Sequence, residues 1–162
     1  MKSVYIETSI PNYLTGRPSR DVRVAAWQQI TNQWWKQEKD RYELYISELV
    51  VREASSGNEE AAQKRLDSLK SITELVVDAE MEALATKLIE ADGFPSVAEI
   101  DALHVAIAAV HSIDLFLTWN CRHINNAETK PIMRAACLKA GYTCPEICTP
   151  QELLREDIND IP

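Results

Sequence analysis

Strand-like and helix-like segments alternate along most of the 162 residues, and this order of segments favours an α/β fold. Apolar runs predict strands at residues 3–7, 42–47, 72–77, 114–120 and 146–149. Helical spacing, caps and composition predict helices at residues 19–39, 48–56, 58–70, 78–93, 97–113 and 128–140. We therefore expect an α/β sandwich with a mainly parallel sheet.

Length and composition fit one globular domain with a sizeable core, since 46% of the 162 residues are hydrophobic. We expect residues 1–154 to form this domain and residues 155–162 to be a polar C-terminal tail. No run of about 18 apolar residues is present, so no membrane span is expected. The opening "MKSVYIETS" becomes acidic and strand-like too early for a signal peptide.

All four cysteines lie from Cys121 onward, at positions 121, 137, 144 and 148. Because they are not spread over a small secreted scaffold, the expected location is a reducing cytoplasm. A zinc site that combines these thiols with His123 is an alternative. The C-x₃-C spacing of Cys144 and Cys148, and the separate elements that would supply the ligands, favour buried free thiols instead.

The formal net charge of −8 argues against a cationic surface that coats nucleic acid without specificity. A nucleic-acid substrate remains compatible with this charge, because a site for divalent metal ions concentrates carboxylates. Arg17, Arg20 and Arg23 follow the first predicted strand, and together with Arg122 they are candidate contacts for phosphate groups. An ordinary solvated charged surface is the alternative for these side chains.

Polar side chains follow two of the predicted strands at the point where each strand ends. In "VYIETSIPNYL" (residues 4–14), Glu7 comes directly after the first strand, and Thr8 and Ser9 follow it. Asn120 ends the run "LFLTWN". In parallel α/β sheets, ligands collect outside the carboxyl ends of the strands. We therefore expect Glu7 and Asn120 to lie at the functional edge, although a surface turn would also explain the acid.

Two further acids can reach the same edge from predicted helices. After the second strand, "ISELVVREAS" offers Glu48 and Glu53, which lie about 140° apart around a helix and cannot share a face. Glu53 is favoured because it follows the face that should contact the sheet. Asp101 is expected in the second turn of a helix that Ser96 and Glu99 cap, at the head of the apolar stretch "ALHVAIAAV".

These segments together resemble the PIN domain, the nuclease domain of VapC-type toxins. The resemblance rests on "YIETSIPNYL", "YISELVVREAS", "DALHVAIAAV" and "LFLTWNCRHI", which occur in the family's order between residue 3 and about residue 126. It implies a three-layer α/β/α sandwich with a mainly parallel sheet of four to five strands. It also implies metal-dependent cleavage of RNA, an antitoxin protein as partner and a second copy of the chain in a dimer.

The resemblance assigns roles to individual residues. The expected catalytic set is Glu7, Glu53, Asp101 and Asn120, and the expected metal ligands are Glu7, Asp101 and Asn120. Thr8, Ser9, Thr118 and His123 are expected to support them. Mg²⁺ or Mn²⁺ is the expected cofactor, because these hard cations prefer oxygen ligands and promote hydrolysis of phosphodiesters. Clustered acids would repel one another without such an ion.

The chain departs from the family pattern at two positions. Glu7 stands where the family has aspartate, and Asn120 stands where the family has its fourth acid. We expect weaker metal affinity, or one bound ion in place of two, with His123 available to contact phosphate or relay a proton. A catalytically impaired scaffold that binds RNA or a protein without cleavage is therefore the alternative function.

Two sets of side chains near these motifs have competing interpretations. The tryptophans of "WQQITNQWW" have helical spacing, which favours the core or an oligomer interface over a stacking platform for RNA bases. His104 lies one helical turn after Asp101. We favour a packed histidine with local hydrogen bonds over one that contacts the site.

Overall fold

A five-stranded parallel sheet forms the centre of the molecule. The computed structural model describes residues 1–155. Its strands are β1 (Lys2–Ile6), β2 (Tyr42–Ser47), β3 (Thr73–Leu75), β4 (Leu115–Leu117) and β5 (Glu146–Cys148). They follow the spatial order β3-β2-β1-β4-β5, and every neighbouring pair is parallel. The predicted α/β fold with a mainly parallel sheet is confirmed.

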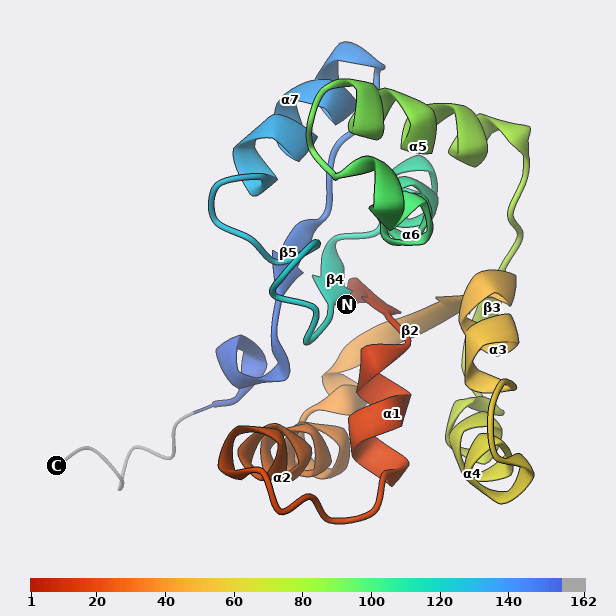
Figure 1. Cartoon of the computed structure of the whole chain (residues 1–162), viewed down its shortest axis with the longest axis vertical. Coiled ribbons are helices and arrows are strands. Elements are labelled where there is room, and N and C mark those ends of the chain that lie inside the picture. The colour runs from red at the N-terminus through yellow and green to blue at the C-terminus, as the bar shows by residue number, and fades with distance from the viewer. Residues whose placement is uncertain (156–162) are drawn as a thin grey trace, which may run out of the picture.

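Within residues 1–155, seven α-helices flank this sheet. Figure 1 shows α1 (Ser9–Thr15), α2 (Val22–Gln37), α3 (Glu48–Ala54) and α4 (Glu59–Leu69) together below it. On the other side lie α5 (Ala79–Glu90), α6 (Glu99–Val110) and α7 (Lys130–Lys139). Three short 3₁₀ turns complete the fold, at Lys39–Arg41, Ser96–Ala98 and Pro150–Leu153. None of the helices within residues 1–155 is long and apolar enough to cross a membrane.

The core lies between the central strands and α6. Val4, Tyr5 and Ile6 of β1 and Phe116 of β4 are fully buried, as expected for strands that are covered on both faces. In α6, the residues from Val105 to Ala109 are almost completely buried, since small alanine side chains let this helix approach the sheet closely. Trp34 is also fully buried, so the interpretation of this tryptophan as a core residue is confirmed.

The strand order places a topological switch point between β1 and β4. From β1, the chain moves outward through β2 to β3 on one side, and β4 and β5 are added on the other side. In open α/β sheets, the crevice at such a point is where ligands bind. The two strands stay paired to their ends, because the N–H of Glu7 donates to the carbonyl oxygen of Leu117 at 3.1 Å. Glu7 therefore lies at the carboxyl end of β1, at this switch point.

Ser47 and Ser96 behave differently from each other as helix caps. Ser47 caps α3 as predicted, and its hydroxyl accepts from the N–H of Val50. The predicted capping box at Ser96 is wrong, because this residue lies inside the 3₁₀ turn that follows Pro95. Helix α6 begins at Glu99 without a side-chain cap. Asp101 consequently lies in the first turn of α6, where unpaired N–H groups favour a carboxylate, and not in the second.

Helix α1 is absent from the elements that the sequence predicts. It spans only Ser9–Thr15 and contains Pro11, which is tolerated because the first turn of a helix leaves its N–H groups without partners. The predicted strands at residues 72–77 and 114–120 are also shorter in the structure, at Thr73–Leu75 and Leu115–Leu117. Of the predicted tail, Arg155 contacts Glu38 through its backbone N–H, and residues 156–162 lie outside the described part.

Candidate functional site

Glu7 is a buried carboxylate, and one of its two oxygens accepts hydrogen bonds from neighbouring residues. Only 6% of the residue is exposed. Its Oε2 accepts hydrogen bonds from the N–H of Ser9 at 3.1 Å, from the hydroxyl of Ser9, and from the hydroxyl of Thr118 at 2.7 Å. Ser9 also accepts from the N–H of Trp119 at 2.9 Å. These contacts join the end of β1 to the segment that follows β4.

Glu53, at the end of α3, faces the same edge of the sheet. Its Oε1 accepts from the hydroxyl of Thr8 at 2.7 Å and is paired with Nε2 of His104 at 2.5 Å. Burial raises the pKa of Glu53, but the hydrogen bond and charge of His104 and the hydrogen bond of Thr8 outweigh it, so the pKa is lower than usual. The alternative acid, Glu48, is exposed and accepts from the N–H of Val77 instead.

Asp101 reaches the site through His123. Its Oδ2 lies 3.0 Å from Nδ1 of His123. The backbone N–H of His123 donates to Oδ1 of Asn120 at 3.0 Å, and the N–H of Asn120 donates to the hydroxyl of Thr118 at 2.9 Å. Thr118 in turn donates to Glu7. A line of hydrogen bonds therefore connects the head of α6 with the end of β1.

These contacts form one set, which we call the acid network. Its members are Glu7, Thr8, Ser9, Glu53, Asp101, Thr118, Asn120 and His123. Glu7 and Thr8 are adjacent in sequence and link the branch that leads to Asp101 with the branch that leads to Glu53. The three acids that the motifs predict thus come from β1, α3 and α6 and meet at one edge of the sheet.

Each of the three carboxylates keeps one oxygen outside the network. Within residues 1–155, the side-chain hydrogen bonds of Glu7 use Oε2, those of Glu53 use Oε1, and that of Asp101 uses Oδ2. Among residues 1–155, Trp34 Nε1 is the only buried side-chain nitrogen or oxygen without a hydrogen-bond partner. Solvent therefore reaches the second oxygen of each acid, which is available to a ligand.

The chemistry of these oxygens fits Mg²⁺ or Mn²⁺, which prefer carboxylate and carbonyl oxygen. Within the described range 1–155, no three His, Cys, Asp or Glu side chains are grouped closely enough to hold a metal by themselves. Mg²⁺ usually keeps several waters and takes only one or two carboxylates from a protein, so its binding does not require three grouped side chains. Oδ1 of Asn120 already accepts from the N–H of His123, so one of its lone pairs is in use.

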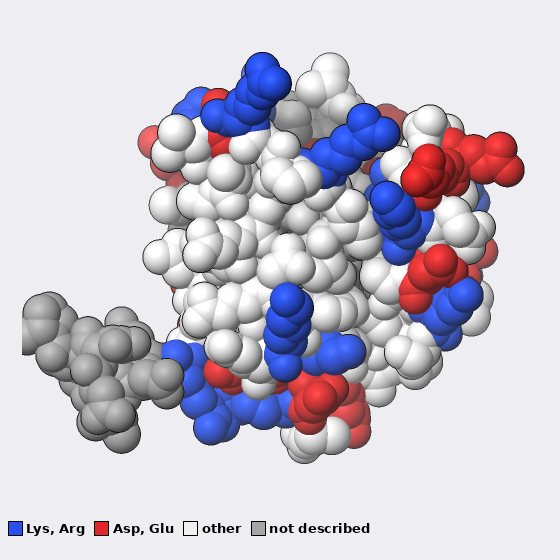
Figure 2. Space-filling model, turned by 90° about the horizontal axis from the view of Figure 1, so that it is seen from below, with Lys and Arg blue, Asp and Glu red and all other residues white. Residues whose placement is uncertain are grey.

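Helix α1 lies in the chain between Glu7 and the three arginines that are predicted to contact phosphate. Arg17, Arg20 and Arg23 are exposed. They follow the seven residues of α1, and a helix of this length spans about 10 Å. Figure 2 shows the lower face, where Lys and Arg stand at separate points around a broad uncharged area. Arg122, also exposed, lies beside His123 in the segment after β4 and is nearer in sequence to the network.

Tryptophans pack behind the network on the α2 side. The rings of Trp27 and Trp119 are stacked with centroids 5.4 Å apart, and Tyr13 contacts both rings edge-on. Nε1 of Trp119 donates to the hydroxyl of Thr31 at 2.7 Å. These rings fix the segment after β4, which carries the backbone N–H that Ser9 binds.

Sequence reasoning missed Tyr5 and underestimated His104. Both are buried, and the Tyr5 hydroxyl lies 2.7 Å from Nδ1 of His104. His104 is packed as predicted, and it also contacts the site through Glu53. Two signals were available, since Tyr5 and Glu7 are alternate residues of the predicted strand at residues 3–7 and His104 follows Asp101 by about one helical turn.

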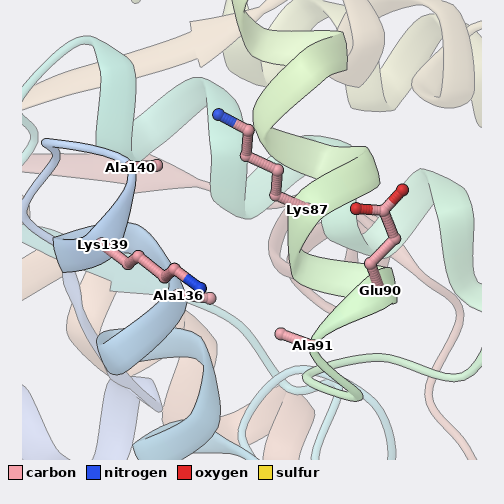
Figure 3. A pocket seen from close by; sticks show the side chains of 6 residues that line it. All are labelled: Lys87, Glu90, Ala91, Ala136, Lys139 and Ala140. Carbon is pink, nitrogen blue, oxygen red and sulfur yellow. The ribbon is translucent and has the colours of Figure 1, made fainter.

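A separate hollow lies between the ends of α5 and α7. It has a volume of about 410 Å³ and is lined by Lys87, Glu90, Ala91, Ala136, Lys139 and Ala140. Figure 3 shows Lys87 and Lys139 extending from two different helices, with three small alanine side chains among the other lining residues. None of the lining residues belongs to the acid network, so this hollow is not the candidate site.

Known proteins resemble the chain in sequence pattern and in fold. A model of the PIN domain family matches residues 4–128. The structure of VapBC2 from Rickettsia felis bound to a promoter DNA fragment is similar, with a TM-score of 0.54, 15% identity, and coverage of 91% of this chain and 98% of that one. FitAB bound to an IR36 DNA fragment gives a TM-score of 0.53, 16% identity, and coverage of 95% and 99%. No curated protein matches the sequence.

Proposed function

This chain belongs to the PIN domain family, as its motifs predict, and we propose that it is a divalent-metal-dependent endoribonuclease. The observation that supports this most is the acid network at the switch point between β1 and β4. Hydrogen bonds through Thr118, Asn120 and His123 connect Glu7 with Asp101, and Glu53 binds Thr8, the residue next to Glu7. Three acids held together at a ligand-binding edge are hard to explain by stability alone.

Residues of the acid network would bind the metal ion that acts on a phosphodiester. Glu7 and Asp101 would hold a Mg²⁺ or Mn²⁺ ion, with Asn120 as a further oxygen ligand. When bound, such an ion supplies positive charge for the phosphate and promotes the loss of a proton from water. Thr118 and Ser9 hold the carboxylate of Glu7 in place.

Two further groups of the chain would act on the substrate itself. Glu53 has a lowered pKa, so its carboxylate is charged near neutral pH and can accept a proton at Oε2. His123 contacts Asp101 through Nδ1, and Nε2 has no protein partner within residues 1–155. Because the Asp101 carboxylate accepts from Nδ1–H, Nε2 of the neutral His123 ring can accept a proton, and the doubly protonated ring would donate Nε2–H to a phosphate oxygen. Arg122, next to it in the chain, would add positive charge at the same place.

We further propose that the chain is the toxin of a toxin–antitoxin pair. This role is supported by the resemblance of its motifs to VapC-type toxins and by its fold, which VapBC2 and FitAB share. An antitoxin protein would then bind over the acid network, and a second copy of the chain would form a dimer. Arg17, Arg20 and Arg23 would contact RNA phosphates beyond α1.

The alternative is a catalytically impaired scaffold that binds RNA or a protein without cleavage. It is favoured by Asn120, which brings no charge and already uses Oδ1 in a hydrogen bond with the backbone of His123. Loss of one acid from the set would weaken the hold on a divalent ion. The two functions differ in what happens to RNA when the ion is supplied.

Cleavage of a mixed RNA pool with controlled metal content separates these functions. We expect the protein to cut RNA in Mg²⁺ or Mn²⁺, to lose this activity in EDTA, and to regain it when Mn²⁺ is added in excess. The products are resolved on denaturing gels. Cleavage that continues in EDTA would contradict the metal-dependent mechanism. Binding of RNA without any cleavage in Mn²⁺ would favour the impaired scaffold.

A further inference from the structure

A second line of hydrogen bonds runs behind Glu53 into the core. The hydroxyl of Tyr5 lies 2.7 Å from Oγ of Ser47 on one side and 2.7 Å from Nδ1 of His104 on the other. Nε2 of His104 continues the line to Oε1 of Glu53 at 2.5 Å. Ser47 also accepts from the N–H of Val50, at the start of the helix that carries Glu53.

The direction of the last bond is fixed by chemistry. A charged carboxylate can only accept a hydrogen bond, so Nε2 of His104 carries the hydrogen that Glu53 accepts. This holds for the neutral ring and for the doubly protonated ring. Thr8 donates to the same oxygen at 2.7 Å. Two donors therefore hold Oε1 of Glu53, one from Thr8 after the end of β1 and one from His104 in α6.

The line is rigid because its members are held by packing. Ser47 and Tyr5 are fully buried, and His104 is 1% exposed. The Tyr5 ring stacks on Phe116 with centroids 5.1 Å apart. Only the Glu53 side chain, 36% exposed, reaches solvent. Apolar residues of similar size would fill this space without the cost of burying polar groups, so stability alone gives little reason for a tyrosine and a histidine here.

We propose that Tyr5 and His104 are positioning residues that hold Glu53 in the acid network. His104 binds Oε1, and Tyr5 holds the His104 ring, so that Oε2 of Glu53 is left for a ligand of the site. The hydrogen bonds of this line are present in the structure, whereas their effect on catalysis rests on the proposed nuclease function. Residues that orient a functional side chain in this way typically change activity or metal affinity about 10–100-fold when they are replaced.

The activity test uses Tyr5→Phe, which removes one hydroxyl, and His104→Gln, which keeps an N–H donor near the position of Nε2 but replaces the rigid ring and its Nδ1 by a flexible amide. We expect Tyr5→Phe to lower kcat for RNA cleavage about 10–100-fold with little change in KM, and His104→Gln to lie between it and the parent. Tyr45→Phe and His111→Gln are matched controls. Tyr45 lies on β2, and His111, which ends α6, is bonded to the carbonyl oxygen of Val76; both should keep parent activity.

A cycle with Glu53→Gln distinguishes positioning from a general structural effect. If Tyr5 acts through Glu53, then Tyr5→Phe should cause no further loss of kcat in the Glu53→Gln background. An equal loss in both backgrounds would overturn the proposal, as would parent kcat in Tyr5→Phe. Thermal unfolding of each variant shows whether the chain is folded when its activity is measured.

A readout independent of RNA keeps this inference separate from the proposed function. In ¹⁵N NMR of the full chain, His104 should carry a hydrogen on Nε2 that exchanges slowly with solvent. Glu53→Ala should accelerate this exchange, and the control Glu48→Ala should not. If the folded parent protein shows no protected Nε2–H, the proposal that this line of hydrogen bonds positions Glu53 is overturned. A protected Nε2–H in a protein that never cuts RNA overturns the nuclease function and leaves the line intact.

Discussion

Replacing Asp101 by asparagine should reduce RNA cleavage by at least about 10²-fold while the protein stays folded. The substitution keeps the size of the side chain and its ability to accept from His123, but removes the negative charge. Asp101 belongs to the acid network, in which His123, Asn120 and Thr118 connect it with Glu7 at the end of β1. The measurement is kcat/KM on a defined RNA in Mn²⁺, with circular dichroism to confirm folding.

The matched control is Glu99→Gln. Glu99 is an exposed acid in the same first turn of α6. Glu99→Gln therefore removes the same charge near the helix N-terminus as Asp101→Asn does. We expect it to keep parent activity. Equal cleavage by the parent and by Asp101→Asn would assign the activity to a contaminant and reject the site. A similar loss in both variants would mean that the charge of the helix end, and not the site, controls the reaction.

A loss of similar size, at least about 10²-fold in kcat/KM, is expected for Glu53→Gln. Glutamine can still accept from Thr8 and His104 at one atom, but it cannot take up a proton or carry charge at the other. Glu48→Gln is the control, because Glu48 also belongs to α3 but binds the N–H of Val77 away from the network. Both variants are assayed on the same RNA in Mn²⁺.

The comparison of these two glutamates decides which acid of "ISELVVREAS" belongs to the site. A larger loss in Glu48→Gln than in Glu53→Gln would contradict the assignment. Unfolding in urea should show that Glu48→Gln lowers stability by no more than about 1 kcal/mol, the usual effect of losing one exposed hydrogen bond. A defect that came only from instability would appear in both the unfolding curve and the rate.

Much of this edge could be predicted from local sequence patterns. Strand β2 begins and ends at the predicted residues, Tyr42 and Ser47, because an apolar run stops at a serine that caps the next helix. Glu7 directly follows β1 for a similar reason, as an acid cannot continue a strand that is buried on both faces. Positions at strand ends are therefore readable when the strand is short and apolar.

Other features depend on contacts between distant segments and could not be predicted in this way. The short helix α1 and the 3₁₀ turn before α6 form where tertiary packing outweighs weak local signals. The bond between Tyr5 and His104 joins residues that lie far apart in the chain. Sequence spacing suggests which residues share a face of an element, but it does not show which faces of two elements meet.

Asn120 has a structural role in the turn after β4. Its side-chain oxygen accepts from the N–H of His123, which shapes the turn after β4 and brings the His123 ring to Asp101. The chain thus places a histidine beside the third acid. A three-acid site with a histidine neighbour can still serve hydrolysis, because one divalent ion needs only one or two carboxylates.

The most direct test of the shared metal site is anomalous diffraction from a crystal of the parent protein soaked in Mn²⁺. The acid network predicts an Mn²⁺ peak at the carboxyl edge of the sheet, within bonding distance of a carboxylate oxygen of Glu7 or Asp101 or both. A well-ordered soaked crystal without a peak at this edge, or with Mn²⁺ bound only elsewhere on the molecule, would contradict it.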